Sequence, residues 1–181
     1  SENEVIHDVN LKIKSGSIVA FVGKSGGGKS TLVSLIPRFY DVTKGTIKIG
    51  GVDVKEISEK ELMSKISFVF QDSRLLKKSF KENIMMGSNA SVEDIQTAVH
   101  KAQCDDIIEK FDQGLETKIG SKGVYLSGGE TQRLTLARAI VKDAPILLLD
   151  EATAYADSDN EVLMQKAIME LAKDKTTIMI A

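Results

Sequence analysis

Eight residues near the start of the chain have the types and spacing of a phosphate-binding loop. The stretch GKSGGGKS, residues 23–30, fits the pattern G-x-x-x-x-G-K-[ST] at every position. Glycines let the backbone pass close to phosphate oxygens, Lys29 offers a cation to the β- and γ-phosphates, and the Ser30 hydroxyl can ligate Mg²⁺. The alternative is a glycine-rich turn that fits by accident, but an apolar run precedes the stretch and a helical run follows it. The sequence therefore predicts a nucleotide site formed by Gly23, Lys24, Ser25, Gly26, Gly27, Gly28, Lys29, Ser30 and Thr31.

Two carboxylates stand together at the end of the apolar run ILLLDE, residues 146–151. If this run is a buried strand of an open α/β sheet, its carboxyl end lies where ligands bind in such sheets. Asp150 could there hold Mg²⁺ through water, and Glu151 could polarise an attacking water. A solvated acidic turn after a core strand is the alternative, and the phosphate-binding pattern upstream favours the catalytic interpretation.

Two further polar features could contribute to the same chemistry. Gln71 ends the apolar run ISFVFQ, where a neutral amide can contact both a metal and a water; an ordinary polar strand end is the alternative. LSGGE, residues 126–130, opens a strongly helical run. Unsatisfied N–H groups and the positive end of the helix dipole make such a corner a place to hold an anion. A glycine-containing helix cap is the alternative there.

Most of the chain alternates between patterns typical of strands and of helices. Strands are predicted within 5–14, 17–23, 65–72, 144–151 and 175–181, a hairpin around Gly50 and Gly51 within 44–54, and helical periods within 92–102, 134–141 and 162–171. This alternation predicts an α/β fold with a mainly parallel sheet that holds the glycine loop and the strand 146–150 side by side. We also expect an antiparallel β part from 1–20 and 45–54, and a helical subdomain of about residues 72–128 inserted in the core.

Composition bounds the class of protein. With 181 residues, 42% of them hydrophobic and 28% charged, the chain is long enough for a domain with a sizeable core. A net charge of −2 gives no reason to expect a nucleic-acid partner. The single cysteine, Cys104, excludes an internal disulfide and fits a reducing compartment. No apolar run approaches the ~18 residues that a membrane-spanning helix needs.

Taken together, the motifs resemble the ATP-binding domains of ABC transporters. GKSGGGKS, Gln71, LSGGE and ILLLDE occur in the order and approximate spacing of that family, and Leu-Ser-Gly-Gly followed by Gln132 and Arg133 separates it from other P-loop proteins. SFKENIMMG and GVYLSGGETQR are similar to the exporter type. The resemblance implies a P-loop NTPase core that binds ATP with Mg²⁺ and hydrolyses it to drive a membrane transporter. Ser30, Gln71 and Asp150 would contact the metal, and Gln71 and Glu151 the attacking water.

The resemblance also implies two partners. In this family two ATPase domains associate head to tail, so that ATP is clamped between the P-loop of one and the signature of the other. Ser127, Gly128, Gly129 and Glu130 would then bind a nucleotide held by a second domain. The signature departs from the commoner pattern in Glu130, where Gln is usual and where a negative charge lies near the anion. A transmembrane domain in the same polypeptide would place the chain at the cytoplasmic face of the cell membrane.

The domain is expected to cover residues 1–181 and to be truncated at both ends. The family has an aromatic residue before the first strand that stacks on adenine, and a histidine after the last core strand that contacts the γ-phosphate. Nothing before Val5 can serve as the first, and the chain stops one residue before the place of the second. The isolated fragment is therefore expected to be weakly active or inactive.

Two other classes of protein fit parts of the pattern. Soluble relatives that act in DNA repair or chromosome organisation insert a long coiled coil between the P-loop and the signature, whereas this interval is short and shows no sustained heptads. Membrane segments encoded upstream of Ser1 would distinguish a transporter from these relatives. A P-loop enzyme or switch of another family would require LSGGETQR to be a coincidence, and ATP-dependent dimerisation would argue against that class.

Overall fold

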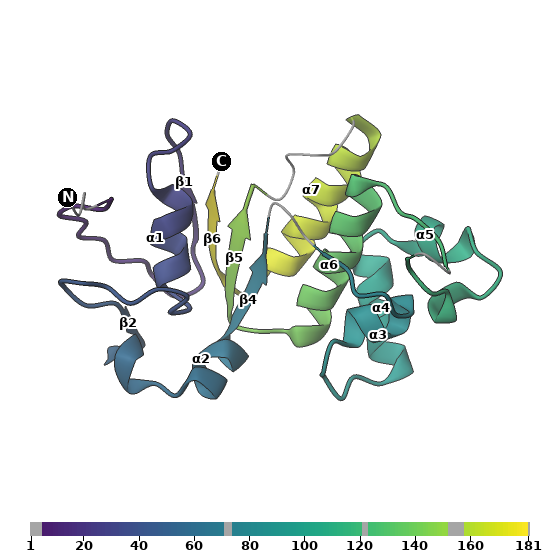
Figure 1. Ribbon diagram of the computed structural model, residues 1–181, viewed down its shortest axis with the longest axis horizontal. Coiled ribbons are helices and arrows are strands. Elements are labelled where there is room, and N and C mark those ends of the chain that lie inside the picture. The colour runs from purple at the N-terminus through teal and green to yellow at the C-terminus, as the bar shows by residue number, and fades with distance from the viewer. Residues whose placement is uncertain (1–4, 71–73, 121–122, 152–157, 181) are drawn as a thin grey trace.

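The computed structural model describes residues 5–70, 74–120, 123–151 and 158–180 (Figure 1). The strands are β1 (Ile18–Phe21), β2 (Lys48–Ile49), β3 (Val52–Asp53), β4 (Ile66–Val69), β5 (Ile146–Asp150) and β6 (Thr176–Ile180). The α-helices are α1 (Lys29–Leu35), α2 (Glu59–Lys65), α3 (Phe80–Met85), α4 (Val92–Lys101), α5 (Asp105–Glu109), α6 (Gly128–Lys142) and α7 (Ser158–Ala172), and Val54–Glu56 and Gly114–Glu116 form short 3-10 turns. Within the described ranges, no helix is both long and apolar enough to cross a membrane.

A parallel sheet with the strand order β1-β6-β5-β4 forms the centre of the fold. In register, Ile180 lies opposite both Phe21 and Asp150, so that β1, β6 and β5 end at the same edge. The prediction of a mainly parallel sheet is confirmed. β6 lies between β1 and β5, and the glycine loop and β5 come together at the shared edge of the sheet, where Ser30 meets Asp150. Strand order depends on how each crossover helix packs, which the apolar pattern of the strands does not encode.

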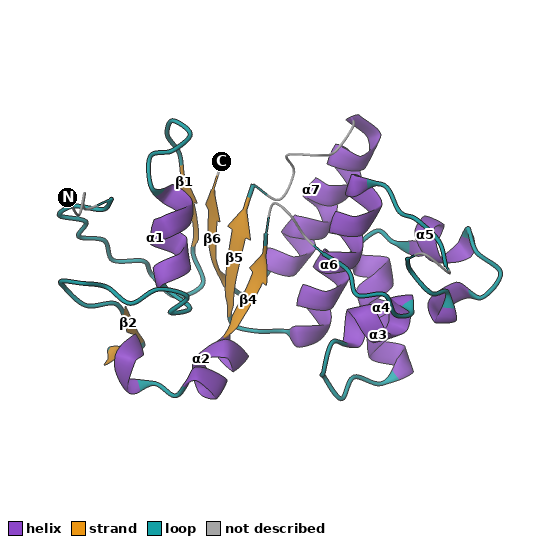
Figure 2. Ribbon diagram, in the orientation of Figure 1, coloured by secondary structure: helices purple, strands orange, loops and turns teal. Residues whose placement is uncertain are grey.

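Helices cover both faces of this sheet, and β5 shows why its run of leucines is continuous (Figure 2). Successive side chains of a strand point to opposite faces. Leu148 packs in a cluster with Val33 of α1 and Leu62 of α2. Leu147 and Leu149 belong to the cluster on the other face, which is built with the helices α3, α4, α6 and α7. Figure 1 shows the same separation, with α1 on one side of the sheet and α6 and α7 on the other.

The antiparallel part of the fold is smaller than expected. β2 and β3 form the predicted hairpin, with Gly50 and Gly51 at φ values of 60° and 89°, which glycine adopts without strain. Residues 5–14, however, form no strand, so the prediction there is wrong. An alternating pattern makes a strand only where a neighbouring strand supplies hydrogen bonds, and β3 pairs with β2 alone. Val5, Val9 and Leu11 remain more than half exposed.

The interval from about 72 to 128 contains the helices α3, α4 and α5 and a short 3-10 turn, joined by loops in its described parts. α3 and α4 pack against α6, which links this part of the chain to the sheet. Ser79 and Ser91 are the N-cap residues of α3 and α4, and each closes a capping box with an acid three residues later. Isolated bridges at Ser79–Lys118 and Ile119–Val124 are the strand-like contacts recorded between 74 and 128.

The thiol of Cys104 should be unreactive in the folded protein. Cys104 has no exposed surface, and burial raises the pKa of its thiol against the opposing charge of Arg133. Because the thiolate is the reactive form, we expect iodoacetamide at pH 8 to modify the native protein about 100-fold or more slowly than the unfolded protein. The rate of alkylation with and without denaturant, followed by mass spectrometry, measures this; equal rates would contradict it.

Candidate nucleotide site

The glycine loop between β1 and α1 is built as a tight backbone cradle. Gly26 and Gly28 have φ values of 77° and 81°, which side chains other than glycine rarely adopt. A Cβ on Gly28 would also lie 3.4 Å from the carbonyl oxygen of Val5. Gly28 is the N-cap of α1 and has no side chain to cap it, so the first N–H groups of the helix remain available to a ligand.

Lys29 lies across this loop. Its ammonium donates to the carbonyl oxygen of Gly23 at 2.7 Å and to that of Lys24 at 3.2 Å. Two backbone carbonyls thus hold the cation against the centre of the loop, where a phosphate would meet it. The remaining predicted residues lie in the same loop or at the start of α1 and are exposed: Ser25, Gly26, Gly27 and Thr31.

Ser30 and Asp150 come together from opposite halves of the sequence. Asp150 is the last residue of β5, and the Ser30 hydroxyl donates to its Oδ1 at 3.1 Å. Since β1 and β5 end at one edge of the sheet, this contact places a hydroxyl and a carboxylate beside the glycine loop. The topology therefore brings together Ser30 and Asp150, two of the three residues that the sequence assigns to the metal.

Glu151 follows directly at the point where the chain leaves the sheet. It is half-buried and has a φ of 45°, in the left-handed region that residues other than glycine adopt uncommonly. A backbone in this region turns sharply, and the sequence predicts such a turn after Asp150. Gln71, the other predicted catalytic residue, lies outside the described residues; β4 ends at Val69, opposite Leu149 of β5.

A cavity next to the glycine loop was not predicted from the sequence. It has a volume of about 480 Å³ and lies between residues of the segment 5–9 and the loop residues Gly27, Gly28 and Lys29. Val5, Ile6 and Val9 give it apolar walls. The alternating pattern of residues 5–14 predicts a strand, whereas the first of these residues line the cavity.

The second predicted anion site, LSGGE, opens α6 as expected. Ser127 is the N-cap: its Oγ accepts the N–H of Glu130 at 3.2 Å, while the carboxylate of Glu130 accepts the N–H of Ser127 at 2.7 Å. Gly128 is exposed and Gly129 is buried. Ser127 and Gly128 thus lie at the surface of the molecule.

The charge of Glu130 is balanced by a residue that sequence reasoning missed. Lys110 donates to Oε1 of Glu130 at 3.1 Å. Burial acts to raise the pKa of Glu130, but the Ser127 N–H and the Lys110 ammonium outweigh burial, and the pKa is lowered. The concern that Glu130 places an uncompensated negative charge near an anion is therefore relieved by Lys110.

The glycine loop and LSGGE do not meet within one chain. α1 packs against the Leu148 face of the sheet and α6 against the Leu147 face. Figure 1 shows the two helices on opposite sides of β1, β6 and β5. One copy therefore presents two separate anion-binding elements rather than one clamp.

Comparisons with known proteins agree with this geometry. A sequence profile described as "ABC transporter" matches residues 6–154. The putative multidrug export ATP-binding/permease protein YgaD of Bacillus subtilis (strain 168) is 45% identical over 181 residues, 99% of this chain and 31% of the relative. A putative multidrug export ATP-binding/permease protein of Staphylococcus aureus (strain NCTC 8325 / PS 47) is 46% identical over 182 aligned residues, 100% of this chain and 32% of the relative.

A solved structure is also similar over nearly the whole chain. The structure of a bacterial Atm1-family ABC exporter with ATP bound matches with a TM-score of 0.92 and 38% identity, covering 99% of this chain and 32% of that chain. The chain spans about a third of the length of these relatives. The fold class inferred from the sequence, with its parallel core, small antiparallel sheet and helices, is confirmed. The chain belongs to the ABC transporter family, as an ATP-binding domain of the exporter type.

Proposed function

We propose that this chain binds and hydrolyses ATP with Mg²⁺ and that its turnover drives an ABC exporter. The observation that carries the proposal is the 3.1 Å contact between Ser30 and Asp150 beside GKSGGGKS. Phosphoryl transfer to water requires groups that bind and neutralise the phosphates and the metal. This site offers a glycine cradle, the Lys29 cation, the Ser30 hydroxyl and the carboxylate of Asp150 at the end of β5. The ATP in the similar exporter structure supports the choice of nucleotide.

The residues beside the loop fit a magnesium ion. Ser30 and Asp150 offer a hydroxyl and a carboxylate oxygen, and Mg²⁺ prefers oxygen ligands, of which the protein usually supplies one or two and the substrate phosphates and water the rest. Among the described residues, no group of three or more His, Cys, Asp or Glu could hold a metal ion, in keeping with a metal that arrives with the nucleotide. Bound there, Mg²⁺ would neutralise phosphate charge.

Each residue of the site then has a separate task. The ammonium of Lys29 binds the β- and γ-phosphates, and the N–H groups at the start of α1 bind the oxygens around it. Glu151 accepts a proton from the attacking water, and the amide of Gln71 orients that water and contacts the metal. The apolar walls formed by Val5, Ile6 and Val9 receive the base and exclude solvent from it.

A second ATPase domain completes the site. Because the glycine loop and LSGGE lie on opposite sides of one chain, we infer that two domains associate head to tail. Ser127, Gly128, Gly129 and Glu130 of one then close over the ATP held by the other. The curated relatives are described as ATP-binding/permease proteins, which supports a transmembrane domain in the same polypeptide and a position at the cytoplasmic face of the membrane.

Replacing Ser127 tests this arrangement. In the full-length protein, Ser127→Ala should lower ATP turnover about tenfold or more, because a donor to the γ-phosphate is lost. The affinity of the P-loop for ATP should be nearly unchanged. Phosphate release and calorimetric titration of ATP measure the two quantities.

The matched control is Ser91→Ala, which removes the same type of N-cap from α4. Either substitution should cost about 1 kcal/mol of stability, so a loss caused by the cap alone would affect both variants equally. Equal turnover in the two variants would contradict a site shared between two domains. It would mean that LSGGE acts only as a helix cap.

A further inference from the structure

The cavity beside the glycine loop offers a nucleobase few side chains that can form hydrogen bonds. Among the described residues that line it, His7 and Lys29 have such side chains. The other lining residues are two glycines and hydrocarbon side chains from the segment 5–9, from β1 and its end, and from α1. The volume of about 480 Å³ is in the range of pockets that hold small organic ligands. A base in this cavity would therefore be held mainly by apolar contact.

Neither of the two polar side chains selects one purine over another. The Lys29 ammonium donates to the carbonyl oxygens of Gly23 and Lys24, at the centre of the loop where a phosphate would meet it. His7 is exposed, and a neutral imidazole is a donor at one ring nitrogen and an acceptor at the other. It can therefore face either the 6-amino group of adenine or the 6-oxo group of guanine, in competition with water.

The rest of the candidate site faces the part that ATP and GTP have in common. Lys29 and the N–H groups at the start of α1 face the phosphates, and Ser30 and Asp150, 3.1 Å apart, face the metal. The two nucleotides carry the same ribose and the same phosphates. Selection between them must come from contacts with the polar edge of the base, and the side chains of the cavity offer few such contacts.

We propose that this site accepts purine nucleoside triphosphates with little distinction, so that GTP is a second substrate beside ATP. A site built to hydrogen-bond one polar group rejects an analogue that lacks it by about 10⁴-fold or more, whereas an apolar pocket discriminates far less. Purines offer more apolar surface than pyrimidines, which favours GTP over CTP and UTP. This inference rests on the proposed function, because it concerns the same site and the same reaction.

The chemical step is the same for both purine nucleotides. The oxygen of water bonds to the γ-phosphorus, and the bond from that phosphorus to the oxygen bridging it to the β-phosphate breaks. Glu151 takes the proton of the water and passes it to solvent. GTP and water thus yield GDP and inorganic phosphate, and no step involves the base.

The test measures phosphate release and affinity with different nucleotides in the full-length protein. With Mg·GTP, kcat/KM should lie within about tenfold of the value with Mg·ATP, and CTP and UTP should give values about threefold or more below that of GTP. Val9→Ala shortens an apolar wall and should weaken ATP and GTP by the same factor of about three, since apolar contact does not depend on the base edge.

Two further variants control for other causes. Val92→Ala shortens a valine of α4 that is 51% exposed, as Val9 is, but lies outside the cavity, and it should leave both affinities unchanged. His7→Leu removes the polar side chain of the segment 5–9 that lines the cavity and should change the ratio of GTP to ATP turnover less than threefold.

The outcomes separate this inference from the function on which it rests. If ATP is bound and hydrolysed but kcat/KM for GTP is more than tenfold lower, the proposed function stands and the inference is wrong. A change in the GTP-to-ATP ratio of more than threefold in His7→Leu would also overturn it, because His7 would then select the base. If Val9→Ala leaves both affinities unchanged, the base does not bind in this cavity and the inference is wrong. If the protein hydrolyses neither nucleotide, both proposals fail.

Discussion

Lys29→Ala should abolish most of the affinity for ATP, weakening binding by roughly 100-fold or more. Lys29 is the cation of the glycine loop, and two carbonyl oxygens hold its ammonium at the centre of that loop. Without it, the β- and γ-phosphates lose their main charge partner in a partly enclosed site, and the N–H groups of α1 remain as the principal donors. Calorimetric titration of the full-length protein with Mg·ATP measures the change in affinity.

Lys60→Ala is the matched control for this experiment. Lys60 is an exposed lysine of α2, outside the candidate site, and its loss should leave ATP affinity within about twofold because exposed charges are strongly screened. Thermal unfolding of both variants confirms that the fold persists. Unchanged affinity in folded Lys29→Ala would mean that GKSGGGKS is not the nucleotide site.

The local part of the site could be predicted from the sequence because its residues are consecutive. GKSGGGKS forms its cradle within a single connection between β1 and α1, and LSGGE caps α6 within a single turn. The meeting of Ser30 and Asp150 also follows from a general rule, since parallel strands end at one edge of a sheet. A separation of 120 residues in the chain therefore did not prevent its prediction.

The features that escaped prediction depend on contacts without a local pattern. The position of β6 between β1 and β5 is set by crossover packing. Residues 5–14 have a strand pattern but no partner strand, and their first residues line the cavity beside Gly28 instead. Lys110 and Glu130 are 20 residues apart in the sequence, and no spacing within one helix or strand relates the two charges. The fold of α5 against α6 is needed to bring them together.

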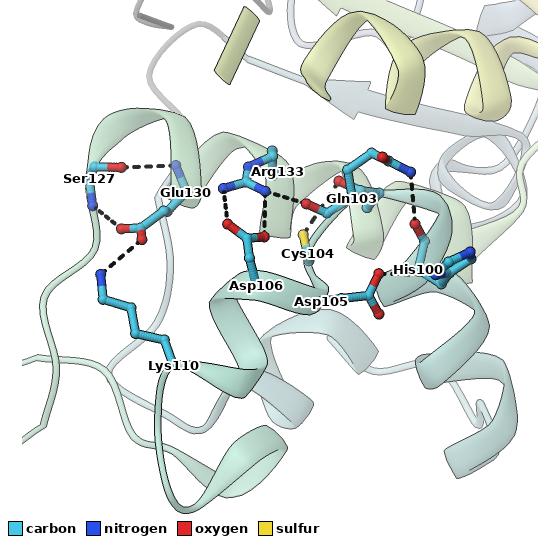
Figure 3. A network of polar contacts seen from close by, with 10 residues as sticks. His100, Gln103, Cys104, Asp105, Asp106, Lys110, Ser127, Glu130 and Arg133 are labelled. Carbon is cyan, nitrogen blue, oxygen red and sulfur yellow. Dashed lines mark hydrogen bonds and ion pairs between the residues drawn. The ribbon is translucent and has the colours of Figure 1, made fainter. Parts of the chain in front are cut away.

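The capping of α6 illustrates how stability and function share residues. In α3 and α4 the serine hydroxyl is engaged by its own helix, and the capping box is a structural device. In α6 the same box keeps its two backbone contacts, and Lys110 also donates to the carboxylate of Glu130 (Figure 3). A sequence pattern of Ser followed three residues later by an acid describes all these helices equally well. What the pattern does not contain is the contact of Lys110 with Oε1 of Glu130.

Glu151→Gln should stop ATP turnover while preserving ATP binding. Glu151 follows Asp150 at the edge of the sheet, in a left-handed conformation that turns the chain beside the glycine loop. As the acceptor of a proton from the attacking water it should contribute about 100-fold or more to the rate, and glutamine cannot accept that proton. Glutamine is nearly isosteric and keeps a polar oxygen, so Lys29, Ser30 and Asp150 should still bind Mg·ATP with affinity within about threefold.

Blocked turnover should also change the oligomeric state of the protein. If ATP clamps two domains together and hydrolysis releases them, the Glu151→Gln protein should accumulate as an ATP-bound dimer. Size-exclusion chromatography of the ATP-binding domain with both flanking regions, with and without Mg·ATP, should show a shift to the dimer in this variant and a smaller one in the natural sequence. Glu161→Gln, an exposed acid of α7, is the control and should match the natural sequence. Turnover of Glu151→Gln at the unmutated rate would exclude Glu151 as the base. Blocked turnover without a dimer would support Glu151 as the base and contradict the head-to-tail dimer.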